Sequence, residues 1–375
     1  LFTRLSPAMI ESRLMLGAVA FLFLFCIALT LSPATRERSW DVEYRWTHWI
    51  GFVLWLVVFK TIQFTARKHF PDSDPYLLPV ASIICGWGLL TIWRLVPEYG
   101  GRQTAWLVLG GIILVIGFRY WKGDHFIRKF KYLWLTAGLV LTALTIIFGT
   151  NPSGGAQKLW LGAFGLYFQP SEPLKLLLIV YFSAYFADRV AFKQNLIALT
   201  LPTAFVTGIV VILLVVQRDL GTATVFIFLY TCMIYIATGR KRYMLISVVI
   251  LIGAAIAGYF LFDVVRLRIE AWINPWLDPS GRSYQIVQAL LAVANGDLIG
   301  RGVGLGSPAL VPVAISDFIF TSIAEETGLM GSLGFIALLA ILVERGFRAA
   351  FHAEDKFKRY LAAGCSIYLG AQSIL

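Results

Sequence analysis

A single aspartate stands at the border of an apolar segment in the last third of the chain. Asp317 lies in Ser316-Asp317-Phe318-Ile319-Phe320, directly before a long apolar run. Aromatic neighbours at such a border would partly desolvate the carboxylate, and a partly desolvated carboxylate is a better proton acceptor. We therefore predict that Asp317 is a general base. The alternative is that Asp317 is only the N-cap of a helix beginning at Phe318.

A carboxylate and an ammonium group stand together at the start of another apolar run, in Gln169-Pro170-Ser171-Glu172-Pro173-Leu174-Lys175. The i, i+3 spacing of Glu172 and Lys175 puts both on one helix face, where they can neutralise each other. A lysine near a helix N-terminus is also placed to hold a phosphate. We predict that Gln169, Ser171, Glu172 and Lys175 bind the substrate. In the alternative interpretation, Ser171 is an N-cap and Lys175 a structural counter-ion, and both interpretations can hold together.

Other charged residues also border or enter apolar runs. Arg94 and Arg102 flank a short connection, and Arg102 is predicted to face an anionic ligand outside the membrane. Glu325 and Glu326 lie within a run, so at least one must face other helices, where ion pairing or hydrogen bonding would satisfy it. Asp219 precedes a further run and is predicted to have a structural role, either pairing with Arg218 or capping its helix.

These residues are set in a chain of membrane character. Of its 375 residues 58% are hydrophobic and 14% charged, whereas about a quarter are charged in soluble proteins. Because about 20 apolar residues span a bilayer, we predict an all-α polytopic membrane protein. The first run is too long for a signal peptide and lacks a cleavage site. The apolar runs lie near 14–32, 47–66, 76–96, 103–121, 132–150, 172–188, 195–216, 221–238, 243–265 and 318–343, and an eleventh begins near 358.

The net charge of +11 follows a topological pattern. Lys and Arg gather after the second, fourth, sixth, eighth and tenth runs, as the positive-inside rule requires of cytoplasmic loops. The basic composition therefore indicates orientation and gives no reason to expect a nucleic acid partner. In this topology Asp317, Lys175 and Arg102 lie on the extracytoplasmic side.

The connections divide the chain. The turn-rich stretch ending at Pro75 separates an accessory helix pair, residues 1–73, from a core over residues 74–375. Two long extracytoplasmic segments, 150–171 and 266–317, interrupt that core. The second is too apolar for a disordered tail, so we predict short interfacial helices, one of them near 285–294. Its glycines at 300, 302, 304 and 306 would let the backbone approach a substrate or another helix.

Several chemistries are disfavoured by the sequence. The four cysteines have no paired spacing and the four histidines do not cluster with carboxylates, so we predict no resident metal site. The glycines after residue 300 are not followed by the Lys-Ser/Thr ending of a phosphate-binding loop, which argues against a nucleotide sugar as donor.

Several linked motifs resemble one family, the RodA- and FtsW-like SEDS (shape, elongation, division and sporulation) proteins, from about residue 74 onward. Leu159, Arg218 and Val313 depart from the family pattern, and anion contacts in the loops of Leu159 and Val313 are expected to differ. The matching motifs are Gln169-Pro170-Ser171-Glu172 with Lys175, Asp219-Leu220-Gly221-Thr222, the Gly300–Gly306 stretch, and Ser316-Asp317-Phe318-Ile319-Phe320 with Ala324-Glu325-Glu326.

The resemblance implies a SEDS fold of ten helices, preceded here by two extra transmembrane helices and truncated in its last spans. It implies a peptidoglycan glycosyltransferase of cell elongation or division that polymerises lipid II, an undecaprenyl-linked disaccharide peptide, on the outer face of the bacterial cytoplasmic (inner) membrane. A class B penicillin-binding protein is the implied partner. The essential carboxylate of the family corresponds to Asp317, and its ion pair to Glu172 and Lys175.

The residues suggest a mechanism in which Asp317 deprotonates the acceptor hydroxyl while Lys175 and Arg102 stabilise the pyrophosphate leaving group. No cofactor is required, and assistance by a divalent cation stays open. Two alternatives remain at this point: a flippase or transporter for the same lipid-linked precursor, and a noncatalytic scaffold of the elongation or division complex.

Overall fold

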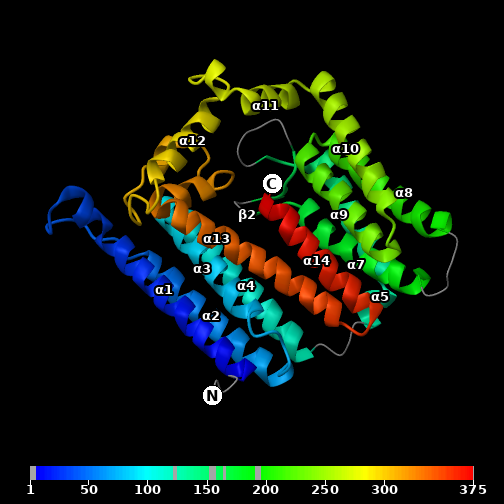
Figure 1. Cartoon of the computed structure of the whole chain (residues 1–375), viewed down its shortest axis with the longest axis horizontal. Coiled ribbons are helices and arrows are strands. Elements are labelled where there is room, and N and C mark those ends of the chain that lie inside the picture. The colour runs from blue at the N-terminus through cyan, green and yellow to red at the C-terminus, as the bar shows by residue number, and fades with distance from the viewer. Residues whose placement is uncertain (1–5, 121–124, 152–157, 164–165, 191–195, 375) are drawn as a thin grey trace. The chain divides into compact units, whose positions relative to one another are not determined.

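The computed structural model describes residues 6–120, 125–151, 158–163, 166–190 and 196–374 (Figure 1). The chain forms two compact units. The first comprises Leu1–Trp121 and Gly258–Leu342, and the second comprises Lys122–Ala257 and Val343–Leu375. Helices α10 and α13 therefore belong partly to each unit. The predicted division at residue 73 stays a prediction.

Each predicted apolar run forms a helix in the described residues, with most ends displaced by a few residues and the last residue of α13 by nine. The described part of the chain holds nine helices long and apolar enough to span a membrane. The two other long helices, α7 (Ser171–Val190) and α14 (Lys356–Ile374), carry several charges. The all-α membrane fold is thus confirmed, and a small hairpin, which the sequence did not predict, is added to it.

The first unit contains the two N-terminal helices, the third and fourth spans and the long segment at 266–317. Its α1 packs on α3, and α2 packs on α4, around a core that includes Leu22, Trp55 and Trp87. A side chain at Gly86 would lie 2.3 Å from Leu22, so this glycine permits the close packing of α1 and α3. The elements are α1 (Pro7–Glu37), α2 (His48–His69), α3 (Leu77–Leu95), α4 (Pro97–Tyr120), α11 (Asp263–Ile273), η1 (Pro275–Leu277), α12 (Tyr284–Gly296), η2 (Pro308–Leu310) and most of α13 (Ile319–His352).

The second unit is built around α7, which packs against α6, α9 and α14. Asp219 caps α9 by accepting a hydrogen bond from the backbone N–H of Thr222 at 3.2 Å, which confirms the predicted capping role. Its elements are α5 (His125–Lys129), α6 (Lys131–Phe148), β1 (Leu161–Ala163), β2 (Leu166–Phe168), α7, α8 (Leu196–Val216), α9 (Leu220–Thr238), most of α10 (Lys241–Leu261), and α14.

Parts of the two long segments, 150–171 and 266–317, form strands and short helices. Strands β1 and β2 pair antiparallel in the first, with Leu161 opposite Phe168; residues 152–157 and 164–165 of this segment lie outside the described residues. Helix α12 confirms the helix predicted near 285–294, and α11 begins shortly before the second segment. Placement of these helices on the membrane surface stays a prediction.

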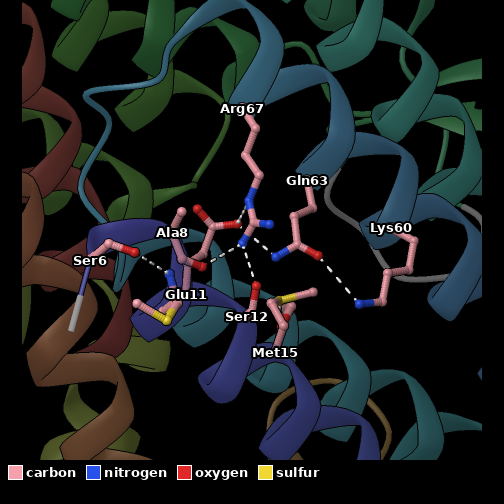
Figure 2. A network of polar contacts seen from close by, with 10 residues as sticks. Ser6, Ala8, Glu11, Ser12, Met15, Lys60, Gln63 and Arg67 are labelled. Atoms are coloured by element: carbon pink, nitrogen blue, oxygen red, sulfur yellow. Dashed lines mark hydrogen bonds and ion pairs between the residues drawn. The ribbon is translucent and has the colours of Figure 1, made fainter.

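A buried carboxylate joins the two accessory helices at their end near Pro7 (Figure 2). Glu11 of α1 accepts hydrogen bonds from the Gln63 amide at 2.7 Å and from Arg67 Nε at 3.1 Å, both on α2. Arg67 also donates to the Ser12 hydroxyl and to the carbonyl of Ala8. Because a buried carboxylate is tolerated only with such partners, this network fixes how α1 and α2 pair.

We expect the substitution Glu11→Ala to lower stability by about 1–3 kcal/mol, because the buried Gln63 amide and the Arg67 guanidinium lose their shared acceptor. Thermal unfolding of the purified protein in detergent measures this change. Ser12→Ala, which removes one exposed acceptor of Arg67, is the matched control and should cost less. Equal melting temperatures for the two variants would contradict a structural role for the buried carboxylate.

Candidate active site

The second unit gathers four of the predicted site residues at the start of α7. Lys175 donates to Glu172 Oε1 at 2.8 Å, and the Gln169 amide donates to the Ser171 hydroxyl at 3.0 Å. Ser171 is the first residue of α7, so its predicted position as the residue preceding the helix is wrong by one. The predicted pairing of Glu172 with Lys175 is confirmed.

Lys175 is one of the most buried charged residues, since its side chain is 2% exposed whereas that of Glu172 is 47% exposed. Two residues of α14, which the sequence analysis missed, complete its surroundings. Gln372 Oε1 lies 3.4 Å from the ammonium, and the Tyr368 ring centroid lies 5.4 Å from it. The Tyr368 hydroxyl also donates to Glu172 at 3.3 Å. The ammonium is thus held in one position, with its charge only partly offset by a half-exposed carboxylate.

The first unit contains the other two predicted site residues. Asp317 is exposed, and among the described residues we find no hydrogen bond or ion pair to its carboxylate. The protein's own side chains therefore do not cover Asp317, and its partial desolvation at the membrane border stays a prediction. The N-cap interpretation is wrong, because α13 begins at Ile319 and the carbonyl of Phe318 accepts from the backbone N–H of Thr321.

Arg102 lies in α4, where its guanidinium is 5.6 Å from the ring of Tyr99. Its side chain is exposed, and within the described ranges no carboxylate pairs with it. A guanidinium in this state keeps its donors available for an anion.

Helix α13 is broken at Gly328, and the carbonyls before the break bond to another part of the backbone. Gly328 has φ 67° and ψ −166°, a conformation outside the helical region. The carbonyls of Glu325 and Glu326 leave the helical ladder and accept instead from the N–H groups of Arg301 and Gly302, both at 3.0 Å. A broken helix in a membrane is tolerated where other backbone replaces its hydrogen bonds.

The residues at 300–307, here called the glycine loop, supply that backbone. A side chain at Gly300 would lie 2.3 Å from the carbonyl oxygen of Glu326. The glycine loop therefore approaches α13 more closely than any other residue type would allow. This confirms the prediction that these glycines permit close approach to another helix.

Two neighbouring glutamates of α13, Glu325 and Glu326, are buried and contact the glycine loop. Glu326 pairs with Arg94 of α3 at 3.2 Å, with side chains 7% and 8% exposed. Glu325 accepts from the backbone N–H of Ser307 at 3.0 Å. The interior placement predicted for at least one glutamate is confirmed, but the sequence did not identify Arg94 as the partner.

A cavity of about 570 Å³ borders the glycine loop and is lined by Arg36, Arg94 and residues 306–311 and 313–315. Arg45 lies in the connection between α1 and α2. Its pKa is lowered mainly by burial and further by the positive charges of Arg94 and Arg36. Three guanidinium groups thus gather at this end of the first unit. Among the described residues, no group of three His, Cys, Asp or Glu side chains could hold a metal ion.

Residues 98–375 match the profile of the cell cycle proteins FtsW, RodA and SpoVE. The chain belongs to this family. A peptidoglycan glycosyltransferase RodA from Mycobacterium tuberculosis is 31% identical over 99% of this chain and 84% of its own length. A protein of Geobacter sulfurreducens named "Probable peptidoglycan glycosyltransferase FtsW" is 34% identical over 73% of this chain and 74% of its own length.

A solved structure described as "Structural coordination of polymerization and crosslinking by a peptidoglycan synthase complex" shares the fold, with a TM-score of 0.55, 23% identity, and coverage of 87% of this chain and 84% of that chain. The FtsW/RodA/SpoVE profile begins after α3, whereas the mycobacterial similarity extends over nearly the whole chain. The sequence of α1 and α2 is thus covered by the similarity to the mycobacterial protein and lies outside the family profile.

Proposed function

We propose that this multi-pass membrane protein is a peptidoglycan glycosyltransferase that polymerises lipid II into glycan strands. The observation that carries the proposal is the 31% identity over 99% of the chain to a protein named as such an enzyme. The site is proposed to lie on the extracytoplasmic side of the bacterial cytoplasmic membrane, which agrees with the distribution of Lys and Arg.

In the proposed reaction, Asp317 accepts the proton of the sugar 4-hydroxyl of an acceptor lipid II. The hydroxyl oxygen bonds to the anomeric carbon of the donor while the bond from that carbon to the pyrophosphate breaks. The exposed Asp317 carboxylate, which has no partner among the described residues, is available for this role. General base catalysis of this kind typically contributes about 10²–10⁴-fold.

The leaving group is undecaprenyl pyrophosphate, an anion that needs no protonation to depart. Lys175 and Arg102 are proposed to stabilise its developing charge. Lys175 offers a fixed ammonium whose counter-ion is half-exposed, and Arg102 offers donors that are not engaged by a described carboxylate. Gln169, Ser171 and Glu172 are proposed to complete the binding site by holding Lys175 and the start of α7 in place.

The proposed partner is a class B penicillin-binding protein, which would cross-link the strands that this chain polymerises. The similarity in fold to a member of a peptidoglycan synthase complex supports an assembly of this kind.

The test places fluorescent lipid II only in the outer leaflet of vesicles that contain the full chain and its partner, with the extracytoplasmic side outward. Polymerisation of this accessible substrate is the expected result. A second set of vesicles carries lipid II in the inner leaflet only. Transfer of that lipid to the outer leaflet without glycan strands would favour a flippase, and neither activity would favour a scaffold; each outcome contradicts the proposal.

A further inference from the structure

The C-terminal end of α1 contacts the glycine loop directly. The Arg36 guanidinium donates to the carbonyl of Gly306 at 2.7 Å and to that of Leu305 at 3.1 Å. Ser32, one turn earlier in α1, approaches Gly304 so closely that a side chain there would lie 2.5 Å from the Ser32 hydroxyl oxygen. These hydrogen bonds thus join residues that lie 269 and 270 positions apart in the chain.

Arg94 of α3 holds the glycine loop from a second helix. Its guanidinium donates to the carbonyls of Gly304 and Gly306, both at 3.1 Å, and its Nε pairs with Glu326. Carbonyls of three successive residues, 304 to 306, are therefore bound by two guanidinium groups. Arg94 has a buried carboxylate partner and serves the packing of α13 as well, whereas the hydrogen bonds that Arg36 makes within the described part of the chain go to the glycine loop.

The glycine loop leads into the segment that ends at Asp317. That segment includes η2 and lines the same cavity as Arg36 and Arg94. It contains Val313 at φ 56°, a conformation that a β-branched residue adopts only where its surroundings enforce it. The start of this strained segment must consequently be fixed, and the hydrogen bonds from Arg36 fix it at Gly306.

We infer that the accessory helix α1 is a positioning element for the proposed active site, in which Arg36 and Ser32 hold the glycine loop and thereby set the place of Asp317. Arg36 is a positioning residue, since it acts through backbone carbonyls. The catalytic consequence rests on the proposed function, but the anchoring itself does not. A helix that served only as a membrane anchor would need no polar contact with this loop.

The test compares Arg36→Ala with Arg36→Lys and with the control Arg38→Ala, which removes an exposed arginine two residues away that has no described contact with the glycine loop. Hydrogen–deuterium exchange measures the amides of residues 300–307, of which Gly302 and Ser307 donate to α13 in the intact protein. Polymerisation of lipid II gives kcat and KM, and thermal unfolding confirms that each variant is folded.

For Arg36→Ala we expect faster exchange confined to the glycine loop and the segment up to Asp317. We also expect kcat to fall about 10- to 100-fold with little change in KM, as for a displaced catalytic group. Arg36→Lys keeps a hydrogen-bond donor and should recover part of the exchange protection and part of kcat. Arg38→Ala should match the wild type in both measurements.

Unchanged loop exchange in Arg36→Ala would overturn the anchoring. Faster exchange with an unchanged kcat would overturn the positioning of Asp317. If the wild type makes no polymer, the proposed function fails, but the exchange measurement still decides whether α1 anchors the glycine loop.

Discussion

Asp317→Asn is expected to reduce lipid II polymerisation at least about 10²-fold, the lower end of what a positioned general base contributes. Asparagine has almost the same shape but cannot accept the proton of the acceptor hydroxyl. Because the Asp317 side chain is exposed and has no partner among the described residues, the change should alter stability by no more than about 0.5 kcal/mol. The loss would therefore be chemical rather than structural. Glycan strands separated by gel electrophoresis provide the measurement.

The matched control is Glu98→Gln, which neutralises another exposed carboxylate of the same unit, in the first turn of α4. This variant should polymerise lipid II at the wild-type rate. Equal polymer from wild type and Asp317→Asn would remove Asp317 from the reaction. It would direct attention to the buried pair of glutamates in α13.

The second large effect is expected at the ion pair of α7. Lys175→Met should lower polymerisation about 10²–10³-fold, which is the usual cost of removing one group that stabilises a developing anion. Methionine keeps the length and most of the volume of the buried side chain, and the half-exposed Glu172 can remain solvated. The accompanying loss of stability should be only about 1 kcal/mol. Steady-state kinetics and thermal unfolding measure the two quantities.

Glu172→Gln and the double variant separate structure from chemistry. The single change leaves the buried ammonium without its carboxylate, which can cost up to about 3–5 kcal/mol for a pair that is fully buried; the exposure of Glu172 makes a smaller loss the expectation. Glu172→Gln with Lys175→Met removes both charges and should restore stability but not activity. Recovery of activity in the double variant would show that Lys175 is only a structural counter-ion.

The sequence predicted the helices well because long apolar runs in a membrane protein have few alternatives to helical structure. It also predicted the Glu172–Lys175 pair and the capping by Asp219, since these depend on spacings of three residues. The contacts of the glycines with α13 were predictable in kind, because four glycines at alternate positions permit close approach. Local spacing thus determined what could be predicted.

Partners distant in the chain could not be predicted in this way. Tyr368 and Gln372 lie almost 200 positions from Lys175, and nothing in their local sequence marks them as its neighbours. The pairing of Arg94 with Glu326 could not be predicted for the same reason, because the two residues are far apart in the chain. The first residue of α13 was also beyond local spacing, because the sequence suggested a helix beginning at Phe318 whereas it begins at Ile319.

The break in α13 at Gly328 also constrains the order in which the chain can be assembled during synthesis. The two glutamates before the break enter the bilayer at low cost only when Arg94 and the glycine loop are ready to receive them. Both partners precede α13 in the chain, so the ribosome supplies them first. Both are therefore already synthesised when α13 is made, and in a variant that loses Arg94 the Glu326 carboxylate would have to enter the bilayer without its cationic partner.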